Sequence, residues 1–265
     1  MRIVIMKKAH QRWAFINYFR LSLRAVLTAI PSGLVVLLYQ KLIMTSNPPV
    51  TPPAESIKNA LSAARVGTYE IATAAHTLDG ALALYAWNSQ VSAAMLSPLH
   101  MCEVVIRNAV SDALTAEYGD RWPWSPGFEA SLPTSGKFNM RAHLKSKRQG
   151  KPTTGKVIPE LAFVFWEKMF TGRFDGNVWN RHLANVMPHL DPSWNTQTAR
   201  GKVNQDISQI RALRNRIAHH EPIFTRSLSD DFKLIQELIG FRCLVTAAWM
   251  VQHQQAQPFF GTKPA

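Results

Sequence analysis

The chain has 265 residues, of which 46% are hydrophobic and 18% are charged, and its formal net charge is +13. This length can bury a core without disulfide staples, and the composition excludes an intrinsically disordered chain. Two cysteines, Cys102 and Cys243, are too few for a disulfide framework or a cysteine-rich zinc module, so we expect a reducing compartment, the cytoplasm. The charge indicates a polyanion or a membrane surface as partner.

The positive charge is concentrated in residues 1–43, which hold seven basic residues and no acidic one, leaving +6 for the rest. An apolar stretch at 25–39 resembles a membrane anchor or a secretory signal, but it is shorter than the ~20 residues of a spanning helix. The arginine-rich, acid-free composition also resembles an organelle transit peptide. We favour a third interpretation, in which translation starts at Met44 or the extension is disordered. No stable membrane association is therefore expected.

The rest of the chain predicts an all-α fold, because apolar residues recur every three or four positions and few segments alternate as strands do. A proline-rich linker at 44–55 precedes a helical domain at 56–255, and 256–265 form a C-terminal tail. Pro98 is expected to begin a new helix, and residues 120–135 are expected to be irregular. Helices are predicted at 56–64, 68–96, 98–118, 137–148, 178–187, 203–219 and 234–252, the last of them mostly buried.

Two patterns favour a structural role. The aromatic segment at 161–170 could stack on bases, but its density of large apolar side chains predicts core packing. Glu103 and Arg107 are four residues apart on one predicted helix, so we expect a helix-supporting ion pair between them.

The spacing of Gly150, Gly155 and Lys156 matches a phosphate-binding loop, but Val157 follows where such a loop needs serine or threonine. A basic helix, not a strand, precedes it, so we interpret the segment as a flexible basic loop. Residues 137–156 carry seven basic side chains and no acidic one. This density is typical of an RNA-backbone contact or, equally, of a solvated helix face. The expected RNA-binding residues are Lys145, Lys147, Arg148 and Lys151.

The pattern with the most specific chemistry lies at 211–222. Arg211, Asn215 and His219 are spaced four residues apart and share a helix face. Arg214 precedes Asn215 by one residue and therefore lies about 100° away around the helix. Arginine can bind phosphate and stabilise transition-state charge, and histidine can move protons near neutral pH. The 2′-hydroxyl of RNA supplies an internal nucleophile, so the chemistry strictly requires no metal or other cofactor. A polar helix face with a hydrogen-bonded histidine remains the alternative.

The residues after this helix face complete the motif. Pro222 predicts that the helix ends close by. His219, His220 and Glu221 are disfavoured as a metal site, because adjacent helical residues diverge by about 100°. Arg211, His220 and Glu221 are therefore expected only to support the catalytic residues.

At these residues the sequence resembles the HEPN superfamily, whose signature is an arginine, a polar residue and a histidine, with four to six residues between the arginine and the histidine. The closer match is the Abi-like (abortive infection, AbiD/AbiF-type) family, and it spans most of residues 56–255. His220 also fits the signature, and His219 is preferred for its placement with Asn215. Val164 departs from an expected glycine. Four ordered segments carry the resemblance: Ala83–Asn88, Glu103–Asn108, Leu161–Trp166 with Trp179 after it, and Arg214–Glu221.

The resemblance implies a HEPN-type helical bundle that is frequently a homodimer, with two motifs facing each other in one RNA-cleaving cleft. It implies that His219 is the general acid and base, that Arg214 stabilises phosphate charge, and that Asn215 orients the reacting groups. The implied biology is bacterial defence against phage by RNA damage, with an antitoxin as a further expected partner. Residues 1–43 lie outside the resemblance, which favours Met44 as the start.

Two other functions stay open from the sequence. A non-catalytic RNA-binding or sensor protein would use the basic region 137–156 and keep the motif only as a dimer interface. A membrane-tethered effector would use residues 1–43.

Overall fold

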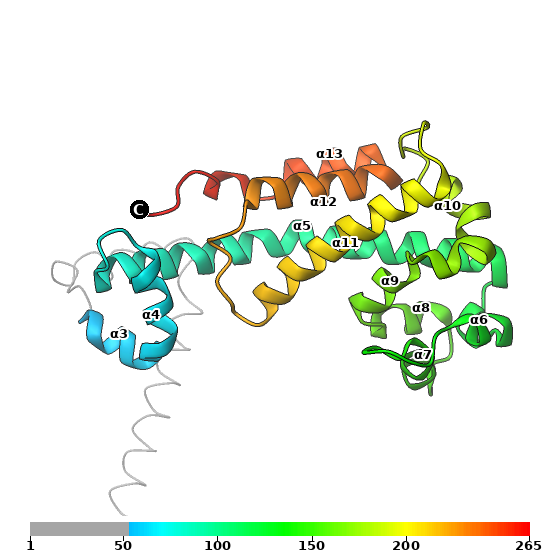
Figure 1. Ribbon diagram of the computed structural model, residues 1–265, viewed down its shortest axis with the longest axis horizontal. Coiled ribbons are helices and arrows are strands. Elements are labelled where there is room, and N and C mark those ends of the chain that lie inside the picture. Colours follow the sequence, from blue (N-terminus) through cyan, green and yellow to red (C-terminus); the bar gives the residue numbers. More distant parts are fainter. Residues whose placement is uncertain (1–52) are drawn as a thin grey trace, which may run out of the picture. The chain divides into compact units, whose positions relative to one another are not determined.

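The computed structural model describes residues 53–265, so the predicted extension at 1–43 and most of the predicted linker lie outside the described residues. Residues 61–265 belong to one compact unit, and α3 (Ala54–Leu61) lies almost wholly in a separate one. All regular elements within 53–265 are helical, which confirms the all-α class (Figure 1). Across this same range, no helix combines the length and apolar character needed to cross a bilayer.

The helix predicted over 68–96 is interrupted. Helix α4 (Ala63–Ala72) ends early, and α5 (Leu78–Tyr118) begins after a short non-helical connection. Thr77 caps α5, because its hydroxyl accepts a hydrogen bond from the Gly80 N–H at 3.2 Å. Threonine favours such local bonds over a helix interior, which explains the break. Helices α4 and α5 then pack against each other.

The predicted helix start at Pro98 is wrong, because α5 runs through this residue without a break. A proline inside a helix costs about 3 kcal/mol, since it removes one hydrogen bond and crowds the preceding turn. Met95, Leu99 and Cys102 are buried on both sides of it. Burying each large apolar side chain contributes about 1.5–3 kcal/mol, so packing along α5 outweighs the local cost.

An aromatic cluster anchors the short helices that follow α5. The Trp122 ring lies edge-on to Phe128 and Trp166, with centroid separations of 5.3 and 6.3 Å. Its Nε1 donates to the Ser111 hydroxyl at 3.2 Å. Phe165 and Trp166 are fully buried, which confirms the core prediction for the aromatic segment. The elements are η1 (Trp122–Trp124), α6 (Pro126–Ser131), α7 (Met140–Arg148), α8 (Thr154–Val157), η2 (Ile158–Glu160) and α9 (Phe163–Met169). Residues 120–135 are thus more ordered than predicted.

His143 on α7 joins this cluster as a neutral side chain. Its Nε2 accepts a hydrogen bond from the Ala162 N–H at 3.2 Å, and its ring packs against Phe138 and Phe165. Burial, together with the nearby charge of Lys147, lowers the pKa of His143. The folded state therefore favours the deprotonated imidazole, which is the form that can accept this bond.

We expect the free energy of unfolding to fall as the pH drops below about 6.5, the usual pKa of an unfolded histidine. The sign follows because the unfolded chain then binds a proton that folded His143 takes up only at lower pH. Urea unfolding at pH 7.5 and 5.5 measures the effect. His143→Gln keeps an acceptor but does not titrate, so it should show a smaller loss than the wild type. An equal loss in both proteins would contradict the assignment.

The C-terminal part of the chain differs from the single buried helix predicted over 234–252. It folds into two helices, and the break lies at Cys243, whose backbone is extended. The second helix exposes Leu244, Val245 and Trp249, so it is not mostly buried. Periodicity cannot reveal this break, because good helix formers lie on both sides of it. The remaining elements are η3 (Gly172–Phe174), η4 (Asp175–Trp179), α10 (Asn180–Val186), α11 (Thr196–Ala218), α12 (Leu228–Arg242), α13 (Leu244–His253) and η5 (Gln257–Phe259).

Candidate functional site

Helix α11 carries the predicted catalytic residues in its C-terminal half. The Asn195 side chain caps its start by accepting a backbone hydrogen bond at 2.8 Å. Ile210, Leu213 and Ile217 are buried, so the residues between them turn toward solvent or toward neighbouring helices. Helix α11 contacts both α5 and α9. Each of these helices supplies a carboxylate to an arginine of α11.

Arg211 forms a structural contact between two helices. Its Nε donates to the buried carboxylate of Glu167 on α9. The side chain of Asn204 also donates to the Glu167 carbonyl, at 3.0 Å. A buried carboxylate left without its partner is strongly destabilising. Arg211 therefore links α11 to α9 and supports the site by fixing the helix, rather than by offering a free guanidinium.

Arg214 lies farther along α11 and is more open. Its Nε is 3.7 Å from Oε2 of Glu103 on α5, and 42% of its side chain is exposed. The predicted ion pair between Glu103 and Arg107 is not found among the described residues, since Glu103 faces Arg214 instead. The Arg107 Nε has no hydrogen-bond partner within this part of the chain. Packing of α5 against α11 overrides the local spacing.

The helix ends at Ala218, close to the end that Pro222 predicts. His219 is the C-cap, and its N–H donates to the Asn215 carbonyl at 2.9 Å. His219 therefore still follows Asn215 by one helical turn. Its imidazole is exposed and makes no hydrogen bond or ion pair with another residue of the described chain.

His220 and Glu221 form the turn after the helix. His220 adopts a left-handed backbone with φ of 56°, which is uncommon for a residue other than glycine. Arg65 on α4 donates to its carbonyl at 2.6 Å. The Glu221 carboxylate lies 3.5 Å from Arg216, whose guanidinium also donates to the Pro222 carbonyl. Contacts to backbone carbonyls thus hold this turn in place.

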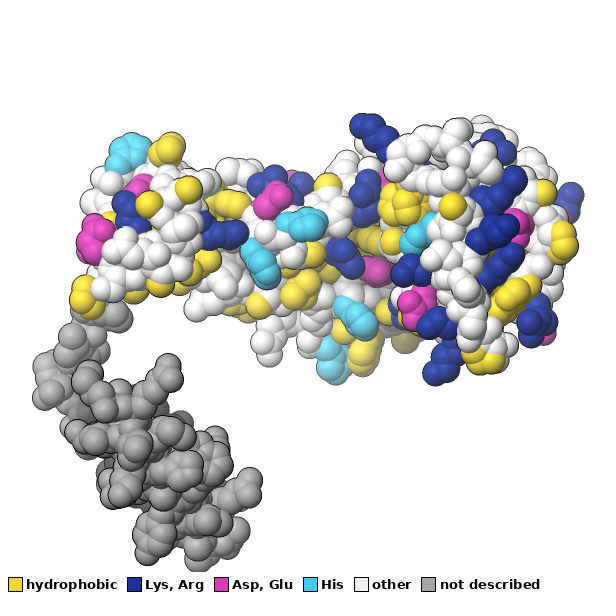
Figure 2. All heavy atoms as spheres, turned by 90° about the horizontal axis from the view of Figure 1, so that it is seen from below, with side chains coloured by type: hydrophobic (Ala, Val, Ile, Leu, Met, Phe, Trp, Pro, Cys, Tyr) yellow, Lys and Arg dark blue, Asp and Glu magenta, His cyan; other side chains and the backbone are white. Residues whose placement is uncertain are grey.

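Figure 2 shows histidine side chains gathered over the middle of one face, and Lys and Arg side chains concentrated toward one end of it. Within residues 53–265, no group of three or more His, Cys, Asp or Glu residues could hold a metal ion.

The basic region 137–156 is partly neutralised by acidic residues from outside it. Arg148 and Lys145 contact Glu129, at 2.5 and 3.6 Å, and Lys151 contacts Glu160 at 2.6 Å. These contacts hold the pKa of both carboxyls below the usual value, through hydrogen bonds to the basic side chains. Of the four predicted RNA-binding residues, Lys147 alone has no ion-pair partner within the described chain.

A cavity of about 280 Å³ lies beside the motif. His220 and Glu221 form one side, Ile217 lies at the end of α11, and the opposite walls come from α4 and α5. His219 does not line this cavity, but His220, the next residue in the chain, does. The walls from α4 and α5 consist of Tyr69, Tyr85, Asn88, Ser89, Ser92, Ala93 and Leu96.

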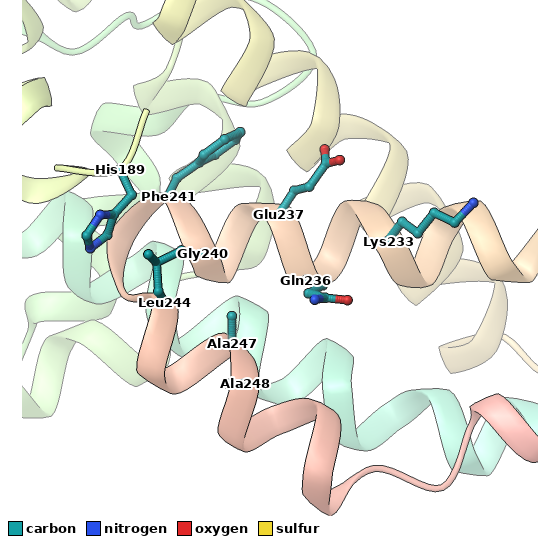
Figure 3. Close-up of a pocket in the computed structure, with 9 residues that line it drawn as sticks. All are labelled: His189, Lys233, Gln236, Glu237, Gly240, Phe241, Leu244, Ala247 and Ala248. Carbon is teal, nitrogen blue, oxygen red and sulfur yellow. The ribbon is translucent and has the colours of Figure 1, made fainter. Parts of the chain in front are cut away.

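A larger cavity, of about 460 Å³, lies between α12 and α13, away from the motif. Figure 3 shows the Gln236 side chain lying between these two helices. Glu237 and Lys233 contribute opposite charges along α12, and His189 comes from the connection before α11. None of the residues that the motif predicts lies in this cavity.

Sequence reasoning missed several residues of the site. Glu167 lies in a segment whose aromatic residues predict core packing, and the spacing of Glu103 predicts a pair with Arg107 rather than with Arg214. Asn88 belongs to a segment that carries the resemblance, yet it had no assigned role. Tyr85 lies in the same segment and also has no assigned role, and Tyr69 gives no signal, because aromatic residues at helical spacing usually belong to the core.

Comparisons of the chain with models of known protein families, with curated proteins and with solved structures give no match.

Proposed function

We propose that this chain is a metal-independent endoribonuclease of the HEPN type, acting in bacterial defence against phage. The observation that carries the proposal is the exposed end of α11, where Arg214, Asn215 and His219 lie within two helical turns. Arg214 is held by one carboxylate at 3.7 Å, so its guanidinium can exchange that contact for a phosphate. The His219 imidazole is open to solvent and can reach a bound RNA.

The proposed reaction is an internal transesterification. The 2′-hydroxyl attacks the adjacent phosphorus, the 2′-oxygen–phosphorus bond forms, and the bond from phosphorus to the 5′-oxygen breaks. His219 takes the proton from the 2′-hydroxyl as general base, and the resulting imidazolium gives a proton to the leaving 5′-oxygen as general acid. Arg214 stabilises the charge that develops on the phosphate oxygens. Two copies of the chain, paired as a homodimer in the cytoplasm, would supply two sets of these groups.

The competing proposal is a non-catalytic RNA-binding or sensor protein. The ion pairs to Glu129 and Glu160 reduce the positive charge available in the region 137–156, which favours the enzyme over this alternative. The two functions separate in one assay, because a sensor binds RNA with a steep salt dependence and leaves it intact.

The test is cleavage of RNA by the full chain with EDTA present. We expect the wild type to cleave and His219→Ala to lose about 100-fold or more, as is typical when a general acid–base group is removed. His253→Ala, which removes another exposed histidine, should leave cleavage unchanged. Loss in His220→Ala with retention in His219→Ala would move the role to His220. RNA that is bound but never cut would instead support the sensor.

A further inference from the structure

We propose that the cavity beside the motif, lined by α4, α5 and the end of α11, is a nucleobase subsite. It would hold the base of the nucleotide next to the cleaved phosphate and so set which nucleotides are cut. This assignment of substrate rests on the proposed function, but the cavity's ability to bind a base can be tested separately.

Asn88 gives the first reason. Its side chain is only 5% exposed, yet it lines the cavity. Its Oδ1 accepts a hydrogen bond from the Ile223 N–H at 2.8 Å, which fixes the orientation of the amide. The Nδ2 group then faces away from that bond, and no described residue accepts a hydrogen bond from it. This fixed amide donor is therefore available to an acceptor on a ligand in the cavity.

Glu221 supplies the complementary group. Its carboxylate can only accept hydrogen bonds, and it lies on the side of the cavity formed by the turn after α11. Arg216, at 3.5 Å, leaves the exposed carboxylate free to accept from a ligand as well. The edge of a nucleobase carries acceptors beside amino or imino donors. One donor from Asn88 and one acceptor from Glu221 match such an edge.

The tyrosines supply an aromatic wall. Tyr69 and Tyr85 have ring centroids 4.9 Å apart, and Phe224 packs behind Tyr69 at 5.2 Å. Tyr69 is buried and Tyr85 is half-buried, so packing already fixes both rings. Bases bind proteins largely by contact with such preformed aromatic surfaces. The volume of about 280 Å³ suits a single base rather than a larger ligand.

The position relative to His219 completes the argument. His220 lines the cavity and His219 precedes it in the chain. In RNA a single ribose separates each base from its phosphate, so a base in the cavity brings its phosphate toward the exposed end of α11. The contact from Arg65 to the His220 carbonyl ties the turn after α11 to α4, which also lines the cavity.

The first experiment measures binding alone. The four ribonucleoside 3′-monophosphates are titrated into the full chain by calorimetry. We expect at least one to bind, and Glu221→Gln to weaken it about fivefold or more, because a neutral amide oxygen accepts a weaker hydrogen bond than a carboxylate does. Asn88→Asp keeps the acceptor for Ile223 but removes the donor, so it should weaken binding too. Glu237→Gln, in the larger cavity, is the matched control and should not change the affinity.

The second experiment maps the ends of RNA cut by the same proteins. The wild type should prefer certain bases beside the cut, and Glu221→Gln should lose that preference. No nucleotide binding, or binding unchanged in Glu221→Gln and Tyr85→Leu, overturns the subsite even if RNA is cleaved. Binding that depends on Glu221 without any RNA cleavage overturns the proposed function and leaves the base-binding cavity standing. Thermal unfolding shows whether each variant is folded. Glu221 lies in an exposed turn, so we expect Glu221→Gln to fold even if a variant of a buried residue does not.

Discussion

Replacement of Arg214 by alanine is expected to slow RNA cleavage about 100-fold or more under conditions in which the wild-type chain cleaves. The reason is that its guanidinium is placed to stabilise charge on the phosphate as the transition state forms, and losing one such donor typically has an effect of this size. Initial rates on a labelled RNA, at saturating and at low RNA concentration, measure it. A donor used only in the transition state lowers kcat and kcat/KM together.

The controls separate this role from a structural one. The contact between Arg214 and Glu103 is 3.7 Å long and partly exposed, so Arg214→Ala should lower the free energy of unfolding by less than about 1 kcal/mol. Arg214→Lys keeps the charge but loses the planar fork, so cleavage should fall to an intermediate rate. Arg181→Ala removes another exposed arginine that pairs with a carboxylate, and it should cleave as the wild type does. Normal cleavage by Arg214→Ala would remove this residue from the proposed site.

Replacement of Trp122 by alanine is expected to lower the free energy of unfolding by about 3–5 kcal/mol. The ring is fully buried, lies edge-on to two other aromatic side chains, and donates to the Ser111 hydroxyl. The substitution leaves a large cavity in the cluster after α5 and also leaves that hydroxyl without its donor. Urea unfolding followed by circular dichroism measures the change, provided that the denaturant slope stays the same.

Two further substitutions serve as comparisons, a milder one at Trp122 and one at a surface tryptophan. Trp122→Phe keeps most of the apolar volume and loses the hydrogen bond, so it should cost clearly less than alanine. Trp249 on α13 is 49% exposed, and Trp249→Ala should change the free energy of unfolding by about 0.5 kcal/mol at most. If Trp122→Ala were as mild as Trp249→Ala, the aromatic cluster would not anchor this part of the fold.

Helix positions followed from the sequence where apolar periodicity was long and uninterrupted. The stripe of Ile207, Ile210, Leu213 and Ile217 predicts α11, and all four side chains are buried. The density of aromatic residues likewise predicts the core segment around Trp166. In both cases the pattern reports the buried face directly, because a helix in a small unit must bury one side.

The breaks between helices were harder to predict. Pro98 looks like a helix start, but α5 passes through it because burial on both sides outweighs one lost hydrogen bond. Cys243 looks like a helix interior, but the chain turns there and α13 packs against α12. Local preference at such positions amounts to a few kcal/mol, and tertiary packing decides which outcome is lower in free energy.

The sequence by itself determined the all-α class, the C-terminal part of α11 and the chemical character of its exposed end, because these depend on residue type and on spacing along one helix. The start of α11 at Thr196, seven residues before the predicted start, was missed. Only the tertiary structure decided which partner each charge takes. Glu103 lies four residues from Arg107 yet contacts Arg214, and Glu167 contacts Arg211, since both carboxylates reach α11 from other helices. The cavity formed by Tyr69, Tyr85 and Glu221 likewise exists only once α4, α5 and the turn after α11 have packed together.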